Sequence, residues 1–493
     1  MMERCRINLQ KATCRQKYLQ LLLCGIYVCI NVFLLYYHEP WRDEAQAWLI
    51  ARDVPLLSIP GYMSYEGHPC LWHLIIACFA KLNMPYFTLN IVSLIIMTIS
   101  VGVMVFCSKI SSYLKTLLIF SPVLTYYYPV IARSYCLIPL FLFFSAFFFK
   151  SRKEHPARYT LAIAFLIQTN VIMIFTAFLM CVCFLTEVVL DCIHKQKKTD
   201  LIKYGGALML PLISVVLLGC QMLDIKNNSE FGIRISGIMD LPVAILFKVR
   251  DIIKDMCGIN VFVLFVIAFL FFALLAATCI YRRSMERGTV FFVIIGTLIG
   301  QIVFYIVFYD FSVQRILVIP LLILWAVWIL KESYNDKSIY ILEMVFSVLI
   351  FIVLLHHIPA IREDIEKPYS GSKEASIFIK ENIPEDAILI SDNKPECSAI
   401  MPYLKQKSYL YAANGEKSSY TKWINGWDAD IEYDQFIAWV KQMDVGEKEV
   451  WLISSCNKSF IVGIEQICED YKLYYESSIP SIQEEDYRIY RLR

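Results

Sequence analysis

Residues 18–37 read YLQLLLCGIYVCINVFLLYY, a run of 20 residues without a charged side chain. A helix needs about 20 apolar residues to cross a bilayer, so this run is long enough to span one. Basic residues precede it, as in a signal peptide, but it is too long for a signal core and no small-residue cleavage site follows. We therefore predict an uncleaved first span, preceded by a cytoplasmic tail at 1–17.

Apolar runs of this kind recur along most of the 493 residues. Only 18% of the residues are charged, whereas a soluble domain carries about a quarter. The sequence predicts a polytopic α-helical membrane protein with about eleven spans. These predicted spans are 18–37, 86–107, 116–132, 134–149, 159–170, 171–190, 204–222, 259–280, 289–309, 316–330 and 339–357.

Flanking charges set the expected orientation. Basic clusters at 150–153, 195–198 and 282–283 predict cytoplasmic loops, because Lys and Arg accumulate on that side. The loop 38–67 holds five acidic residues against two arginines and should face outside. In a multi-pass protein of the cell membrane, this places the N-terminus in the cytoplasm and the end of the membrane domain (18–360) outside.

Two segments do not fit a simple span. Residues 68–82 are apolar but too short to cross, so we expect a helix lying on the outer surface and completing a first external loop at 38–85. The run 159–190 has basic residues at both flanks, which requires two short helices that enter and return. They should meet at 168–170, where polar residues, Asn170 among them, would point toward the outer face.

From residue 361 onward the composition is that of a soluble domain. Alternating helical and strand patterns predict a small extracytoplasmic α/β domain at 361–493. Expected helices are 372–381 and 460–469, and expected strands are 387–390, 449–453, 471–477 and 487–492.

Two adjacent acids open the first external loop. Pro40 suits the first turn of a helix, which places Asp43 and Glu44 where the helix dipole favours carboxylates. An ionised carboxylate at a membrane surface can take a proton from a hydroxyl group. Acids in a first helical turn also occur simply as helix starters, and that alternative stays open.

A turn follows at Glu66-Gly67-His68-Pro69. Gly67 permits a sharp turn, and Pro69 starts the surface helix. His68 would then lie at headgroup level, where an imidazole can donate to a phosphate. The alternative is a turn with an interfacial histidine that binds nothing.

Two arginines are expected at the outer ends of later spans. Arg133, close to Tyr135, lies next to hydrocarbon and needs a partner such as phosphate or carboxylate, unless it extends to the headgroups. Arg315 is the second, and Asp310 offers it an ordinary ion pair.

Other classes of function have less support. No basic cluster is interleaved with aromatic residues, so a nucleic-acid partner is not expected. The cysteines show no metal-ligand spacing. No predicted span carries an ionisable residue near its middle, which weakens an ion-coupled transporter.

The first-loop motifs resemble those of the GT-C glycosyltransferases, specifically the bacterial branch similar to protein O-mannosyltransferases and aminoarabinose transferases. Members carry an Asp-Glu pair in the first external loop and a surface helix opened by His-Pro or Lys-Pro. Here Asp43-Glu44 and His68-Pro69 occupy those positions, and His68 stands where aminoarabinose transferases have Lys.

Weaker parts of the resemblance lie further along the chain. Arg133 with Tyr135 corresponds to an arginine junction at the outer end of a later span, and the loop 308–315 ends in Arg315, as in the family's late external loop. A C-terminal extracytoplasmic α/β domain is also common in the family.

The resemblance implies transfer of a sugar from a polyprenyl-phosphate-linked donor to an acceptor hydroxyl at the outer membrane face. Asp43 would act as the base and Glu44 would orient the acceptor or position Asp43. The substrate and its phosphate would be bound by His68, Arg133, Glu66, Tyr135, Arg315 and Asn170. Membrane lipids surround the protein, and the acceptor is a glycan, a lipid or a protein. No cofactor is certain, and a divalent cation stays open. The alternatives are a lipid or solute transporter without enzymatic activity, or a receptor whose C-terminal domain is the active part.

Overall fold

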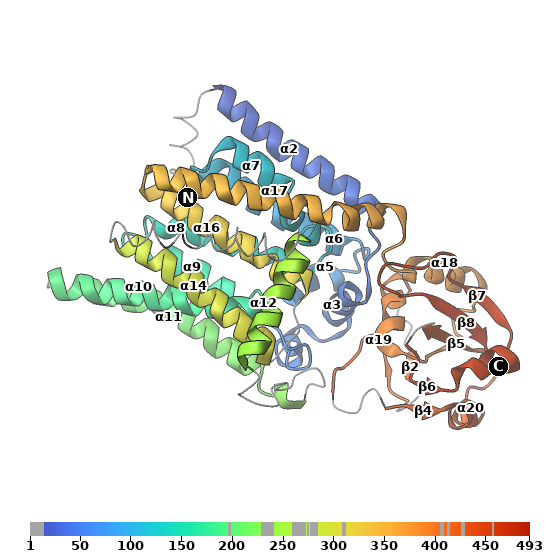
Figure 1. Ribbon diagram of the computed structural model, residues 1–493. Coiled ribbons are helices and arrows are strands. Elements are labelled where there is room, and N and C mark those ends of the chain that lie inside the picture. Colours follow the sequence, from blue (N-terminus) through green and yellow to red (C-terminus); the bar gives the residue numbers. More distant parts are fainter. Residues whose placement is uncertain are drawn as a thin grey trace.

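The computed structural model forms a bundle of apolar helices with a small α/β domain at one end (Figure 1). It describes residues 14–195, 199–227, 241–258, 273, 276, 284–307, 312–404, 409–411, 415–424, 429–455 and 458–493. The predicted fold class, a polytopic helical membrane protein with a C-terminal α/β domain, is confirmed. The predicted span 259–280, apart from residues 273 and 276, and the loop residues 308–311 lie outside the described residues.

Seven helical stretches of the described residues are long and apolar enough to cross a membrane. They are built from α2 (Cys14–Tyr37), α6 (Thr88–Cys107), η4 (Val171–Met173) with α10 (Ile174–Lys195), α11 (Thr199–Gln221) with η5 (Ile225–Asn227), α14 (Met285–Val307), α15 (Val313–Ile316) with α16 (Val318–Ser333), and α17 (Lys337–Glu366).

Shorter elements complete the helical part. These are α3 (Arg42–Asp53), η1 (Leu56–Ser58), α4 (Ile59–Tyr62), α5 (Leu71–Ala80), α7 (Ser112–Ile119), the π-helical turn η2 (Val123–Tyr127), η3 (Ser134–Cys136), α8 (Leu137–Phe149), α9 (Pro156–Ile167) and α12 (Leu241–Cys257).

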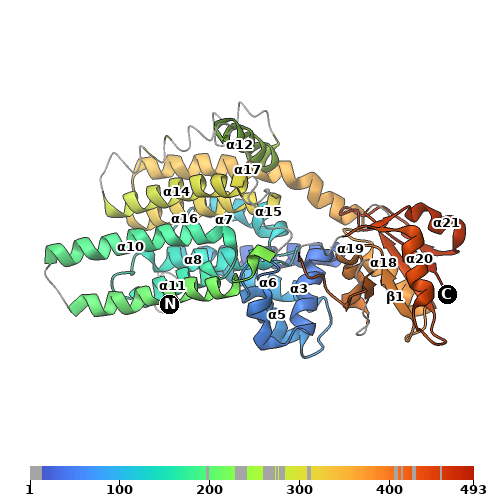
Figure 2. The same cartoon turned by 90° about the horizontal axis from the view of Figure 1, so that it is seen from below.

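Two of the irregular predictions match the structure. Helix α5 is the short helix expected at 68–82. The run 159–190 is divided as predicted, because α9 ends at Ile167 and the next helical turn begins at Val171. The last turn of α10 and the first turn of α11 lie at the end of the bundle remote from the α/β domain (Figure 2).

The predicted span 116–132 is wrong. Helix α7 ends at Ile119, and from there to Arg133 the chain is a series of turns that are almost entirely buried. Pro122 and Pro129 lack the N–H that a continuous helix needs. Irregular backbone is tolerated at membrane depth only where protein groups satisfy it.

Neighbouring side chains supply those partners. The hydroxyl of Tyr27 donates to the carbonyl of Leu124 at 2.8 Å, and the amide of Asn90 donates to that of Val130 at 3.1 Å. Ser93 donates to the carbonyl of Tyr128 at 3.0 Å. These bonds fix the backbone of the turns. The turns end at Arg133, which lies at the end of the bundle nearest the α/β domain.

The α/β domain is built on a six-stranded sheet of order β3-β2-β1-β5-β8-β7. Its strands are β1 (Ile388–Ser391), β2 (Tyr409–Tyr411), β3 (Lys417–Ser418), β5 (Val450–Ser455), β7 (Leu473–Glu476) and β8 (Tyr487–Arg491). Central β1 is parallel to both β2 and β5, so the carboxyl ends of these three strands share one edge. Beside the sheet lie α18 (Ser372–Asn382), α19 (Lys394–Cys397), η7 (Ser398–Tyr403), α20 (Tyr433–Gln442), η8 (Ile464–Gln466), α21 (Ile467–Asp470) and a small pair of strands, β4 (Ile431–Glu432) and β6 (Ile461–Val462).

One domain prediction differs from the structure. The helix expected at 460–469 is replaced by β6, a turn and two short helical turns. Gly463 lies between them with φ +80°, a left-handed conformation that interrupts a helix.

Helix α17 joins the two parts of the molecule. It runs for 30 residues and leads directly from the bundle to the α/β domain (Figures 1 and 2). The sequence placed the domain boundary at 361, inside this helix.

Candidate active site

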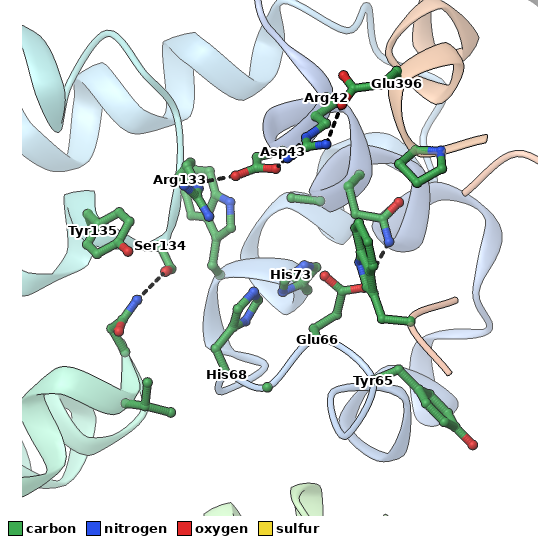
Figure 3. A pocket seen from close by; sticks show the side chains of 18 of the residues that line it. Arg42, Asp43, Tyr65, Glu66, His68, His73, Arg133, Ser134, Tyr135 and Glu396 are labelled. Atoms are coloured by element: carbon green, nitrogen blue, oxygen red, sulfur yellow. Dashed lines mark hydrogen bonds and ion pairs between the residues drawn. The ribbon is translucent and has the colours of Figure 1, made fainter. Parts of the chain in front are cut away.

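A cavity of about 640 Å³ lies where the first loop, the bundle and the α/β domain meet. Its lining combines charged, aromatic and amide side chains from all three parts (Figure 3). Every predicted site residue except Glu44 lines it: Asp43, Glu66, His68, Arg133, Tyr135, Asn170 and Arg315.

Asp43 lies in the first turn of α3. The helix begins after Trp41, whose backbone N–H donates to the Glu44 carboxylate at 3.3 Å, as the acid of a capping box does. Asp43 therefore lies at the positive end of the helix dipole, which favours its ionised form.

Two arginines hold the Asp43 carboxylate. Nη1 of Arg133 lies 3.0 Å from its Oδ2, and Nε of Arg42 lies 3.5 Å from its Oδ1 (Figure 3). Burial alone would raise the pKa of Asp43, but the charges of Arg133, Arg42 and Arg315 lower it below its ordinary value. Asp43 is thus an ionised carboxylate with about a quarter of its side chain exposed to the cavity.

Arg133 is fixed from several sides. Its Nη1 also donates to Oε1 of Gln314 at 3.2 Å. Its guanidinium lies 5.9 Å from the ring centre of Trp41 and 5.5 Å from that of Tyr135, within the range of cation–π attraction. A residue that the sequence placed between two spans is therefore a positioned cation.

Arg315 lies on α15, close to Tyr135. Its Nε donates to the hydroxyl of Tyr135 at 3.3 Å, so Tyr135 contacts both Arg133 and Arg315. Asp310, the ion-pair partner considered from the sequence, lies outside the described residues.

Asn170 occupies the break between α9 and η4. Its amide donates to Oγ of Ser134 at 3.3 Å, and its Oδ1 caps η4 by accepting from the N–H of Ile172 at 3.2 Å. This residue thus joins the break to the segment that carries Arg133 and Tyr135.

Glu44 points away from the cavity and is completely buried. Its Oε1 accepts from the N–H of Ala132 at 2.8 Å, and its Oε2 lies 3.1 Å from Nε2 of His38. Nδ1 of His38 in turn lies 2.8 Å from Oδ2 of Asp364 on α17. Burial opposes a charge on His38, yet Asp364 and Glu44 outweigh it and raise the pKa of His38 to about 10. An imidazolium therefore joins α3 to α17.

The turn at 66–68 forms a different part of the lining. Burial raises the pKa of Glu66 to about 8, and its Oε1 accepts from Nε2 of Gln46 at 2.8 Å. Burial and the nearby Arg133 lower the pKa of His68 to about 4. Glu66 and His68 are therefore mainly uncharged at neutral pH.

The sequence reasoning missed the contribution of the α/β domain. Glu396 at α19 pairs with Arg42 at 2.5 Å, and Asn393 and Lys458, after the carboxyl ends of β1 and β5, also line the cavity. Ligands of parallel sheets bind outside those ends, which is the signal that could have found them. This rule could not be applied to the sequence, because the order of the strands in the sheet was not known.

His73 on α5 also escaped prediction, because a histidine inside an apolar run is usually a packing residue. As for a metal, the described residues contain no group of three or more His, Cys, Asp or Glu side chains arranged to hold one.

Comparison with known proteins shows a common fold. The crystal structure of ArnT from Cupriavidus metallidurans bound to undecaprenyl phosphate is similar with a TM-score of 0.50, over 96% of this chain and 98% of that chain. The sequence identity is 9%. No protein-family model matches the chain, and no curated protein matches it in sequence. The chain thus shares the overall fold of the ArnT structure.

Proposed function

We propose that this protein is a glycosyltransferase that moves a sugar from a polyprenyl-phosphate carrier to an acceptor hydroxyl at the outer membrane face. The observation that carries the proposal is the ionised Asp43 carboxylate, held between two arginines in a cavity between bundle and α/β domain. The fold supports it, because the similar ArnT structure was solved with undecaprenyl phosphate.

Asp43 serves as the base in this reaction. Its carboxylate takes the proton of the acceptor hydroxyl while that oxygen attacks the anomeric carbon of the sugar. The new C–O bond forms as the bond to the phosphate oxygen breaks. The electron pair of the broken bond leaves on the polyprenyl phosphate, and the anomeric configuration is inverted.

The leaving phosphate is stabilised by fixed cations. Arg133 and Arg315 both lie against Tyr135, and preorganised charges of this kind stabilise a developing anion without reorganisation. His68 contributes as an uncharged hydrogen-bond donor. Asn170 holds the Ser134 end of this segment in place.

Glu44 acts indirectly. The two oxygens of its carboxylate already form hydrogen bonds with Ala132, Asn90, Trp41 and His38, and neither oxygen faces the cavity. We assign it the positioning of α3, and hence of Asp43, relative to the segment that carries Arg133.

Replacing Asp43 by Asn tests the proposal. Comparing envelope glycans of a deletion strain and its parent identifies the product, and transfer is then measured in membranes supplied with the matching polyprenyl-linked donor. Asp43→Asn should lower the transfer rate by about 10²–10⁴-fold, the usual contribution of a general base, while the protein still accumulates.

The matched control is Asp53→Asn, at the other end of α3 and outside the cavity lining, where Asp53 pairs with Arg52. This variant should keep normal transfer. Normal transfer by Asp43→Asn would remove the catalytic assignment and favour the transporter reading.

A further inference from the structure

Two histidines form a stacked pair beside Asp43. The ring centres of His68 and His73 lie 5.4 Å apart with 19° between the planes. His73 is only 1% exposed, and both residues line the cavity. Figure 3 shows the pair near the centre of the view with Glu66 beside it, and Ser134 and Tyr135 to the left.

Polar atoms of this segment lack partners within the protein. Among the described residues, neither ring nitrogen of His73 has a hydrogen-bond partner, and the same holds for Nδ1 of His68 and Nε1 of Trp72. Buried polar groups are almost always paired, because an unpaired one costs about 1–3 kcal/mol. Since the residues that carry these atoms line a cavity, a molecule bound there is the natural partner.

The missing partner must both donate and accept. A neutral imidazole offers one N–H donor and one acceptor nitrogen, and an indole offers one donor. Burial lowers the pKa of both histidines, so the rings are uncharged at neutral pH. Hydroxyl groups donate and accept, and they match this set better than a phosphate or an ammonium group does.

Glu66, the acid next to the histidine pair, is a further uncharged polar group. Glu66 carries its proton at neutral pH, because burial raises its pKa to about 8. Gln46 holds it at 2.8 Å and is itself fixed, since its amide exchanges two hydrogen bonds with the backbone of Thr421. The segment 66–73 thus presents rigid, polar and uncharged groups. The positive charges of the lining lie on other segments, at Arg42, Arg133, Arg315 and Lys458.

We infer that residues 66–73 form a subsite for an uncharged sugar ring, whose hydroxyl groups bond to His73, Trp72 and Glu66. The inference rests on the proposed function, because the sugar arrives on the phosphate that Arg133 and Arg315 bind. A sugar with an ammonium or carboxylate group would bury its charge here without a counter-charge from this segment, at a cost in affinity.

Binding to the full-length protein in lipid nanodiscs tests the subsite. The probes are undecaprenyl phosphate alone and undecaprenyl phosphate carrying glucose, an amino-deoxy pentose or glucuronic acid. The wild-type protein should bind the glucose-bearing carrier about tenfold more tightly than bare undecaprenyl phosphate and more tightly than either charged sugar. His73→Phe keeps the ring and removes both nitrogens. It should abolish that tenfold gain and leave the affinity for bare undecaprenyl phosphate unchanged.

The outcomes separate the two proposals. If undecaprenyl phosphate binds but glucose adds no affinity, or a charged sugar binds best, the subsite is wrong while the proposed function stands. If no carrier binds, or binding survives Arg133→Gln, the proposed function fails and the subsite with it. Should His73→Phe not fold, the wild-type series decides the class of sugar, and His73→Asn, which keeps a polar side chain, replaces it as the variant.

Discussion

Asp43 and Glu44 are neighbours in sequence but have different surroundings. Successive helical residues point about 100° apart, so one acid faces the cavity and the other faces the bundle. The sequence could single out this pair and place Arg133 at the same end of the molecule. It could not decide whether Glu44 orients the acceptor or positions Asp43, because the contacts of Glu44 include His38, which in turn contacts Asp364, 326 residues after His38.

Replacing His38 should destabilise the protein. Its imidazolium lies between Glu44 and Asp364, and removing one partner of a buried charge network costs about 3–5 kcal/mol. We expect His38→Leu to lower the melting temperature in detergent clearly, whereas Glu39→Gln, which breaks an ion pair with the exposed Lys373, should cost only about 0–1 kcal/mol.

The same network predicts a pH dependence of stability. The pKa of His38 is raised to about 10 in the folded protein, so its contribution is complete below the ordinary value of 6.5 and declines as pH rises toward 10. The difference in melting temperature between wild type and His38→Leu should therefore shrink from pH 6 to pH 10. A constant difference would contradict the charged bridge.

Glu66 predicts a pH effect on binding. With a pKa of about 8, its side chain is neutral below that value and gains a negative charge as pH rises through it. Affinity for undecaprenyl phosphate should then fall about fivefold between pH 7 and pH 9, which corresponds to ~1 kcal/mol of repulsion. Glu66→Gln should bind equally well at both pH values, and a fall of the same size in this variant would exclude Glu66 as its cause.

At the scale of elements, the lengths of the apolar runs and the charges at their ends decided what the sequence could predict. The break at 168–170 was predictable, because basic flanks on both sides of 159–190 demand a return. The turns at 120–133 were not, because their backbone depends on Tyr27, Asn90 and Ser93, which lie on other helices. The strand order of the α/β domain was also inaccessible, and with it the cavity edge formed by β1 and β5.

Besides the Arg42–Glu396 pair, an amide side chain joins helix α3 to the α/β domain. Gln46 accepts from the N–H of Thr421 at 3.0 Å and donates to its carbonyl at 2.6 Å. Gln46→Leu leaves both backbone groups buried without this partner, at a cost of about 1–3 kcal/mol. Amide hydrogen exchange at residues 417–424 should become faster by a matching factor.

Tyr62→Phe is the control for this experiment. It removes only the 3.1 Å bond from the Tyr62 hydroxyl to the same carbonyl, so exchange should change less than in Gln46→Leu. Equal effects of the two variants would show that Gln46 is not the main connection.

At the scale of the whole molecule, composition and apolar runs were sufficient for the fold class. About eleven spans were predicted, and seven of them are membrane-length helices among the described residues. The α/β domain was also predicted, whereas its placement against the first loop was not. That placement depends on contacts such as Arg42 with Glu396, between residues 354 positions apart.

Orientation in the membrane is a prediction at this scale. If loop 38–67 faces outside, a cysteine at position 57, where Leu57 is 94% exposed, should react with an impermeant maleimide on intact cells. A cysteine in place of the exposed Glu154 should react only after the membrane is opened. Both are tested in a background whose exposed native cysteines are replaced by serine. Reversed labelling would place the cavity on the cytosolic side and contradict the proposed reaction.

Helix α17 contains a proline, Pro359, between the bundle and the α/β domain. Pro359 has no N–H to donate, which weakens the helix at that point, and it precedes Asp364 on the way to the α/β domain. If α17 bends at Pro359, Asp364 and the α/β domain therefore move together. Because His38 connects Asp364 to Glu44, this movement would also tilt α3. Motion of the α/β domain would then change the position of the Asp43 carboxylate.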